Sequence, residues 1–216
     1  MKSAATAAGR DPREVMLLAV SKTHPAALIE QALAAGQRCF GENYVQEALD
    51  KMEAMKGRPH LPEWHLIGPL QSNKTRVVAE RFDWVQSIES EKVARRLSEQ
   101  RPAGLAPLNV LIQVNVSGEA SKAGVAAGQV SSLAEIMKKL ARIRLRGLMA
   151  IPEPGADAAR YRELRSLYEK LKGEFGFDTL SVGMSDDMET AIAEGSTLVR
   201  IGTAIFGARQ EVRPAA

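Results

Sequence analysis

The chain has 216 residues, of which 45% are apolar and 25% are charged. This is an ordinary globular composition, which excludes wholesale disorder, and the length allows one or two domains. The net charge is only +3, and the basic residues are spread over both halves without the basic block that is typical of nucleic-acid binders.

The single cysteine, Cys39, lies in the short stretch RCFG. One cysteine excludes an intrachain disulfide and gives no support to a multi-cysteine metal site, so we interpret Cys39 as a small buried core residue. The three histidines are too scattered along the chain to predict a set of metal ligands. We therefore predict no metal site.

No apolar run approaches the ~18 residues that a membrane-spanning helix needs. The first 15 residues lack the apolar segment of a secretory signal. We therefore expect a cytoplasmic protein that binds neither membranes nor nucleic acid.

Short β-rich runs alternate with helical patterns along the whole chain. The first run, 15–22, is almost continuously apolar, as expected of a strand covered on both faces. We predict further strands at 38–44, 64–69, 84–89, 108–116, 144–152, 179–184 and 196–207. We predict helices at 25–36, 45–55, 73–82, 91–100, 130–140, 156–172 and 187–195.

Eight strands that alternate with helices suggest either an open doubly wound sheet or a closed (β/α)8 TIM barrel. The count of eight favours the barrel, and no glycine-rich dinucleotide fingerprint follows the first strand. Only seven helices separate eight strands, so the eighth covering helix must come from a short N-terminal helix within 1–14. We predict one α/β domain over 1–216, with 210–216 as a C-terminal tail.

Lys22 is the most unusual residue at the C-terminal ends of the strands, where barrels of this class place their active sites. It follows a run of apolar and small residues at the end of the first strand. Burial would lower the pKa of its amine and let the free base attack an aldehyde as a Schiff-base lysine. The alternative is a solvated lysine at a strand end.

Two glycine-containing turns follow the seventh and eighth strands, where barrels commonly hold a phosphate. Ser185 precedes a predicted helix, so its hydroxyl and the first free backbone N–H groups can face an anion. Gly202 permits close backbone approach, and Thr203 adds an N–H and a hydroxyl. The alternative is simple helix capping, since Asp186 and Glu189 have the spacing of a capping box.

An aldehyde-reactive lysine beside a phosphate cradle points to a phosphorylated aldehyde, and pyridoxal 5′-phosphate (PLP) is the candidate cofactor. Arg200, two residues before Gly202, could reach the pyridine nitrogen of PLP and keep it unprotonated. The alternative for Arg200 is a structural salt bridge.

Six motifs in chain order carry a resemblance to a known family: LLAVSKTHP, FGENYVQEA, WHLIGPLQSNK, GLMAIP, SVGMSDDMETAI and VRIGTAIFG. Together they resemble the pyridoxal phosphate homeostasis proteins, which are short fold type III PLP-binding barrels similar to the N-terminal domain of alanine racemase. The resemblance runs from about residue 15 to 209. The N-terminal helix is shorter here than is usual for that family.

The resemblance implies a role for each site residue. Lys22 forms the Schiff base, and Arg200 lies near the pyridine nitrogen. Ser185, Gly202 and Thr203 match phosphate-binding positions, and Asn43 matches a site-facing asparagine. Four other residues lie in or beside the matching motifs: Met149 and Met184, which we interpret as core methionines, and His65 and Lys74, which receive no role.

The resemblance favours a non-enzymatic PLP carrier that buffers the reactive aldehyde and delivers it to apo-enzymes. The alternative is an amino-acid racemase of the alanine racemase type, which needs a second acid–base group opposite the lysine. The three tyrosines are Tyr44, near the barrel mouth, and Tyr161 and Tyr168, which we expect to pack on a helix. A Schiff-base aldolase without PLP is a third, weaker hypothesis. We expect a monomer with no catalytic residues.

Overall fold

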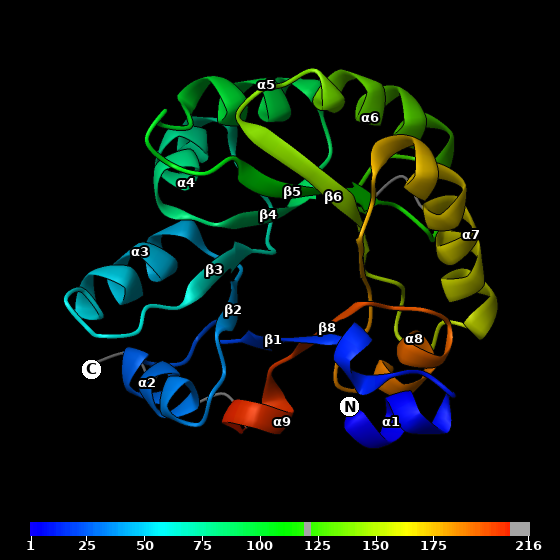
Figure 1. The fold of residues 1–216 in the computed structure, drawn as a ribbon, viewed down its shortest axis with the longest axis horizontal. Coiled ribbons are helices and arrows are strands. Elements are labelled where there is room, and N and C mark those ends of the chain that lie inside the picture. The colour runs from blue at the N-terminus through cyan, green and yellow to red at the C-terminus, as the bar shows by residue number, and fades with distance from the viewer. Residues whose placement is uncertain (119–121, 208–216) are drawn as a thin grey trace, which may run out of the picture.

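The computed structural model describes residues 1–118 and 122–207, so the predicted tail at 210–216 lies outside the described residues. Eight parallel strands close into a barrel in chain order, with β8 paired to β1 (Figure 1). The predicted (β/α)8 barrel is confirmed, and the open sheet is wrong. The strands are β1 (Met16–Val20), β2 (Cys39–Glu42), β3 (Glu63–Leu66), β4 (Trp84–Ile88), β5 (Leu108–Val114), β6 (Ile143–Ala150), β7 (Thr179–Ser181) and β8 (Leu198–Ile201).

Helices form the outer layer around the barrel (Figure 1). They are α1 (Lys2–Ala7), α2 (Ala26–Ala34), α3 (Val45–Ala54), α4 (Thr75–Arg81), α5 (Glu91–Gln100), α6 (Val130–Lys138), α7 (Ala158–Phe175), α8 (Met188–Ala193) and α9 (Thr203–Phe206). Three single 3-10 turns, at Pro12–Glu14, Ser72–Lys74 and Ala127–Gln129, precede β1, α4 and α6.

The short N-terminal helix supplies the eighth covering element, as the strand count requires. Ala5 of α1 is fully buried against Ile192 of α8 and Val199 of β8. The Arg10 guanidinium then donates to the backbone carbonyls of Ile192 and Ser196 at 2.8 and 2.7 Å. The shortness of this helix therefore does not prevent it from packing on the barrel.

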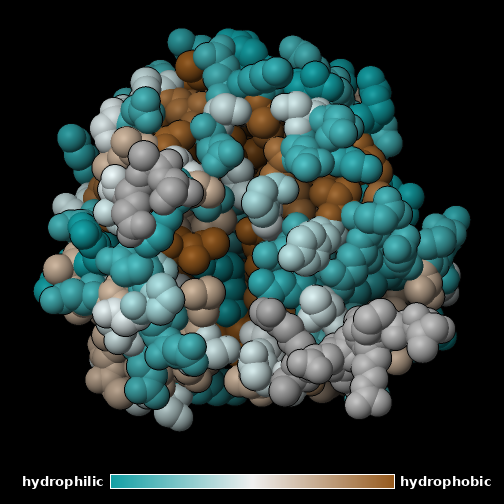
Figure 2. Space-filling model, turned by 180° about the vertical axis from the view of Figure 1, so that it is seen from behind, coloured by the Kyte–Doolittle hydropathy of each residue, from teal (hydrophilic) through white to brown (hydrophobic). Residues whose placement is uncertain are grey.

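The strands bury side chains on both faces. The outward side chains of most strands pack against the helices in one large core, which includes Phe40, Leu66 and Val85. Those of β8, Val199 and Ile201, pack in a separate cluster with α1 and α8. The inward side chains form two small apolar clusters inside the barrel: Leu18, Val20, Ile67 and Leu198, and Trp84, Leu111 and Met149. Seen from behind in Figure 2, hydrophilic residues cover most of the rim, while apolar residues show in the recesses between them.

Candidate functional site

A cavity of about 540 Å³ opens at the C-terminal ends of the strands. This volume is in the range of small-molecule and cofactor sites. Its walls include all six residues that the sequence singled out: Lys22, Asn43, Ser185, Arg200, Gly202 and Thr203. Apolar walls come from Val20, Ile67, Ile151 and Met184. The barrel thus brings together residues that are up to 181 positions apart, because parallel strands carry their C-terminal ends to one face.

Lys22 lies two residues beyond the end of β1, and its side chain is half-buried in the cavity wall. The next residue, Thr23, has a φ of +66° and is the sole non-glycine residue with positive φ in the described chain. Its N–H donates to the Glu47 carboxylate on α3. Such a conformation costs on the order of 1 kcal/mol or more and persists where the surroundings hold it. The segment that presents Lys22 is therefore anchored from α3.

Lys51 ties this segment to the barrel in a way that our sequence analysis missed. Its ammonium donates to the Ser21 carbonyl at 2.8 Å, to Glu42 Oε1 at 2.7 Å and to Glu47 Oε1 at 2.6 Å. Lys51 is only 6% exposed and Glu42 is fully buried. The four-residue spacing of Glu47 and Lys51 on one helix was the available signal. The buried ion pair of Lys51 and Glu42, together with the bond from Lys51 to the Ser21 carbonyl, fixes the backbone just before Lys22.

Asn43 follows β2, and its side-chain oxygen is buried in the cavity wall without a hydrogen-bond partner. A buried acceptor that is left unpaired is costly in free energy. Gly68 holds Asn43 closely, since a Cβ at position 68 would lie 2.2 Å from the Asn43 carbonyl oxygen. The glycine is therefore required by the close approach of the two loops.

The segment after β7 carries Ser185 to the cavity, and the capping box of Asp186 and Glu189, considered as the alternative, is wrong. The helix α8 begins at Met188, and its N-cap Asp187 makes no side-chain bond to the helix. The Asp187 carboxylate instead accepts the Met184 N–H and the Tyr161 hydroxyl, both at 2.5 Å. The Asp187 side chain therefore binds Tyr161 on α7 and the Met184 N–H instead of capping α8. Its negative charge is directed to these two donors.

The predicted strand at 196–207 is also too long. The strand β8 ends at Ile201, Gly202 is the N-cap of α9, and Thr203 is the first residue of that four-residue helix. Gly202 and Thr203 line the cavity as a turn rather than as a strand. Glycine suits this turn because a Cβ at position 202 would lie 3.2 Å from the Val20 carbonyl oxygen, a tight contact that glycine avoids.

Arg200 lies on β8 with its guanidinium buried inside the barrel at the base of the cavity. Its Nη1 donates to the Ser181 carbonyl at 2.9 Å and the Ser181 hydroxyl at 2.8 Å, and Nη2 donates to the Ala150 carbonyl at 2.9 Å. Burial lowers the pKa of Arg200 to about 10, so the side chain stays positively charged at neutral pH. These three acceptors are neutral oxygens, so they do not form the salt bridge considered as the alternative.

Of the other residues named from the sequence, Met184 and Asp186 line the cavity and the rest lie away from it. Met149 is a core methionine inside the barrel, as interpreted, whereas Met184 is 38% exposed, so its interpretation as a core methionine is wrong. His65 is fully buried inside the barrel, and Lys74 is exposed at the end of a 3-10 turn. None of the tyrosines is among the described residues of the cavity wall: Tyr44 is 60% exposed, and Tyr161 and Tyr168 are buried on α7. Cys39 is only partly buried, so its interpretation as a buried core residue is wrong.

Within the described residues, helices capable of crossing a lipid bilayer are absent, since none combines sufficient length with sufficient apolar character.

The fold and the cavity define a class, and sequence comparison gives the same class. Residues 2–210 match the family described as alanine racemase, N-terminal domain. Among solved structures, alanine racemase from Corynebacterium glutamicum has a TM-score of 0.70 at 17% identity over all of this chain and 60% of that one. At this identity the similarity shows the fold alone. The chain is a barrel of the alanine racemase N-terminal type.

Closer relatives identify the family within this class. The chain is 60% identical to the pyridoxal phosphate homeostasis protein of Pseudomonas aeruginosa, over 100% of this chain and 94% of that protein. It is 56% identical to the Escherichia coli K12 protein of the same name, over 97% and 92%. PipY of Synechococcus elongatus, solved with PLP bound, has a TM-score of 0.83 at 38% identity over 94% and 97%. The chain belongs to the pyridoxal phosphate homeostasis protein family.

Proposed function

We propose that this protein holds PLP in the cavity at the C-terminal ends of the strands, through a Schiff base with Lys22, and delivers it within the cytoplasm to apo-enzymes that need it. The observation that carries this proposal is the convergence of Lys22, Arg200 and the segment around Ser185 in one cavity of about 540 Å³. PLP contains an aldehyde, a pyridine ring and a phosphate. Lys22, Arg200 and the segment around Ser185 are chemically complementary to these three groups, in that order.

The residues present fit the cofactor. Lys22 supplies the amine for the aldehyde, and Ser185, Gly202 and Thr203 supply hydroxyl and backbone N–H groups for the phosphate. The orphaned Asn43 oxygen offers a hydrogen-bond acceptor. Met184 and Tyr161 donate to the Asp187 carboxylate, so its charge is directed to these donors. The Asp186 carboxylate is exposed at the cavity wall, where solvent screens its charge.

PLP supplies an electron sink when its ring nitrogen is protonated. Arg200 carries a positive charge at neutral pH, since the pKa of about 10 lies well above that value. A cation beside the pyridine nitrogen opposes its protonation, so the residue favours storage of the cofactor over chemistry on it. None of the tyrosines lies in the described cavity wall, and the Tyr161 hydroxyl already binds Asp187. These observations support a carrier rather than a racemase.

The first experiment locates the cofactor. Purified protein mixed with PLP is reduced with borohydride and digested, and mass spectrometry identifies the modified lysine. We expect the adduct on Lys22, and we expect Lys22→Ala to lose both the adduct and the visible absorption. Lys51, which is buried in its own ion pair, serves as the internal control. An adduct on another lysine in the wild-type protein would contradict the assignment.

The second experiment separates delivery, passive storage and catalysis. The loaded protein is mixed with an apo-transaminase, and the rate of activation is compared with the rate at which free PLP dissociates into a trapping reagent. Activation faster than dissociation supports delivery, and equal rates contradict it. Robust interconversion of alanine enantiomers by the pure protein would overturn the non-catalytic role. Light scattering tests the expected monomer.

A further inference from the structure

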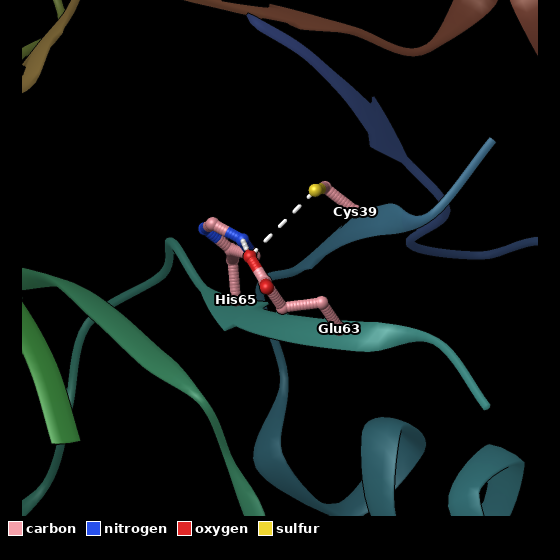
Figure 3. Close-up of side chains that lie close together, drawn as sticks. All are labelled: Cys39, Glu63 and His65. Atoms are coloured by element: carbon pink, nitrogen blue, oxygen red, sulfur yellow. Dashed lines mark hydrogen bonds and ion pairs between the residues drawn. The ribbon is translucent and has the colours of Figure 1, made fainter. Parts of the chain in front are cut away.

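The side chains of Cys39, Glu63 and His65, which carry different donor atoms, lie close together (Figure 3). Cys39 is the first residue of β2 and Glu63 is the first residue of β3, and the register pairs them. His65 follows two residues later on β3, so its side chain lies on the same face as that of Glu63. Because these are the amino ends of the strands, the Cys39–Glu63–His65 cluster lies away from Lys22.

The donor atoms of this cluster are close together. The Cys39 Sγ lies 3.6 Å from Glu63 Oε1, and His65 Nε2 lies 2.9 Å from the same oxygen. One donor atom from each residue lies within 4.8 Å of the others, and no other group of three is found among the described residues. His65 is fully buried, whereas Cys39 and Glu63 are partly exposed. The cluster is therefore held from inside the barrel and open to solvent on one side.

We propose that Cys39, Glu63 and His65 bind a divalent transition metal of the zinc class. A thiolate sulfur, an imidazole nitrogen and a carboxylate oxygen are the ligands that zinc takes in proteins, and three protein ligands leave a fourth position for water. Bond lengths of about 2.0–2.3 Å place tetrahedral ligand atoms about 3.3–3.8 Å apart. The two contacts to Glu63 Oε1, at 2.9 and 3.6 Å, lie just below and within that range, and one donor atom of each residue lies within 4.8 Å of the others.

The charges around the cluster favour a cation. The Glu63 carboxylate lies 3.6 Å from the Cys39 sulfur, and Asp83 adds a second negative charge nearby. Asp83 is itself fixed by the Trp64 N–H at 2.8 Å. Without a metal these carboxylates disfavour a thiolate, whereas a bound metal ion supplies the positive charge that makes thiolate ligation favourable. Metal binding therefore releases the thiol proton. The negative charges of the Glu63 carboxylate and the Cys39 thiolate then balance the two positive charges of the metal ion.

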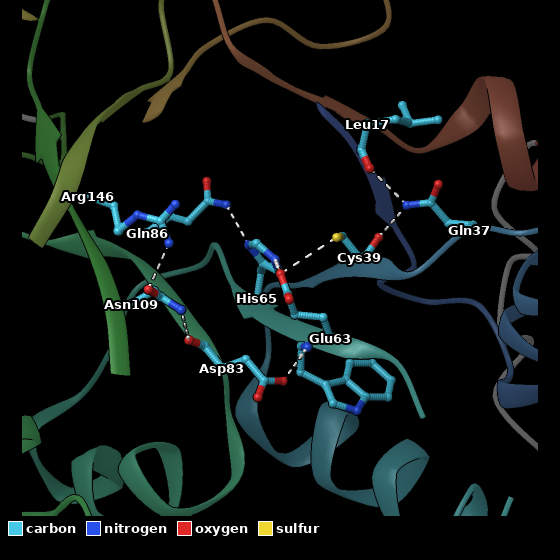
Figure 4. Close-up of polar contacts among 10 residues, drawn as sticks. Leu17, Gln37, Cys39, Glu63, His65, Asp83, Gln86, Asn109 and Arg146 are labelled. Atoms are coloured by element: carbon cyan, nitrogen blue, oxygen red, sulfur yellow. Dashed lines mark hydrogen bonds and ion pairs between the residues drawn. The ribbon is translucent and has the colours of Figure 1, made fainter. Parts of the chain in front are cut away.

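The buried side of the cluster orients the imidazole (Figure 4). The His65 ring stacks on Trp84 with centroids 5.0 Å apart and 8° between planes. Its Nδ1 accepts from Gln86 Nε2 at 2.9 Å, so its proton is on Nε2, facing Glu63. A metal on Nε2 moves that proton to Nδ1. Gln86 then turns its amide, so that Oε1 accepts from Nδ1 and the amide nitrogen donates to the Ser181 hydroxyl, which is the present donor to Oε1. Metal-bound histidines in proteins are oriented by a hydrogen-bond partner on the second ring nitrogen, and Gln86 is that partner for His65.

The test uses Co²⁺ as a spectroscopic substitute for Zn²⁺. Cys39 is the sole cysteine, so a thiolate-to-cobalt charge-transfer absorption can come from no other residue. The full-length Lys22→Ala protein is titrated, which keeps PLP out of the spectrum and makes the result independent of the proposed function. We expect one Co²⁺ per chain with this absorption, and its stoichiometric loss when Zn²⁺ displaces the cobalt.

Matched variants identify the ligands. Cys39→Ser removes the charge-transfer absorption, and Glu63→Gln retains the thiol but weakens Co²⁺ binding at least tenfold. His65→Asn has the same effect as Glu63→Gln, and circular dichroism confirms the fold of each variant. His65 is fully buried, so His65→Asn is the variant at risk of not folding. Cys39 and Glu63 are partly exposed, so Cys39→Ser and Glu63→Gln decide the test without it. Absence of the absorption at stoichiometric Co²⁺ overturns the proposal. Unchanged affinity in Glu63→Gln also overturns it, because it indicates a lone thiol.

Discussion

The Arg200 guanidinium donates to the Ser181 hydroxyl at 2.8 Å, and this hydrogen bond joins the cofactor cavity to the interior of the barrel. Ser181 in turn donates to Gln86 Oε1 at 2.7 Å, and Gln86 Nε2 donates to His65 Nδ1 at 2.9 Å. All four side chains are buried. Arg200 Nη1 also donates to the Ser181 carbonyl at 2.9 Å. The orientation of Arg200 therefore depends on Ser181, which does not line the cavity.

Ser181→Ala tests this dependence. The change leaves Gln86 Oε1 and one Arg200 N–H without a partner, which we expect to cost about 1–3 kcal/mol of unfolding free energy. We also expect PLP affinity to fall about tenfold, equivalent to about 1.4 kcal/mol, as the guanidinium loses its fixed orientation. Denaturant unfolding and an absorbance titration with PLP measure the two effects.

Ser196→Ala is the matched control for Ser181→Ala. Ser196 is also fully buried, but its hydroxyl contacts only backbone carbonyls, those of Leu180, Val182 and Leu198. We expect a similar loss of stability and unchanged PLP affinity. Equal losses of affinity in the two serine variants would show that the Arg200 chain has no specific role.

Lys51→Met tests the anchor of the Lys22 segment. The Glu42 carboxylate is fully buried, and the change leaves it without its cation, which we expect to cost about 3–5 kcal/mol. Lys56→Met is the control, because Lys56 and Glu53 form an exposed pair with 76% and 62% of their side chains accessible. We expect that control to change stability by less than about 0.5 kcal/mol. Comparable losses in both variants would contradict the anchoring role.

The same variant has a predicted pH dependence. Burial already raises the pKa of Glu42 above 4.5, and removal of Lys51 raises it further. A carboxyl whose pKa is higher in the folded than in the unfolded state takes up its proton on folding, so stability rises as pH falls through the folded-state value. We therefore expect the stability deficit of Lys51→Met to shrink from pH 7 toward pH 4.5. A deficit that grows over this interval in chemical denaturation would contradict this mechanism.

The barrel was predictable because a strand and a helix alternate eight times, and the strands carry the site residues at their C-terminal ends. The end of β8 was not predictable from apolar pattern, since residues 203–206 are as apolar as a strand but form a helix. The contacts of Asp187 could not be predicted from the sequence either, nor could the series of hydrogen bonds from Arg200 through Ser181 and Gln86 to His65. They depend on pairs such as Gln86 and Ser181, which are 95 residues apart and meet only once the barrel closes.

Gly68→Ala tests how Asn43 is held. A methyl group at position 68 would lie 2.2 Å from the Asn43 carbonyl oxygen, so the two loops must separate. We expect a stability loss of about 1–3 kcal/mol from this overpacking and weaker PLP binding, measured by titration. Gly104→Ala is the control, because nothing lies within 4 Å of the added methyl group. Retention of full PLP affinity in Gly68→Ala would show that Asn43 does not contact the cofactor.

Tyr161→Phe tests whether Asp187 is kept from opposing the phosphate. The Tyr161 hydroxyl donates to Asp187 Oδ2, and without it that oxygen loses a donor beside the segment that carries Ser185. We expect PLP to bind about fivefold to tenfold more weakly, equivalent to about 1.0–1.4 kcal/mol, the size of one such hydrogen bond. Pyridoxal, which lacks the phosphate, should bind with unchanged affinity. Tyr168→Phe, on the same helix and equally buried at 2% exposure, should affect neither ligand. Equal weakening of PLP and pyridoxal in Tyr161→Phe would place the effect on the ring rather than on the phosphate.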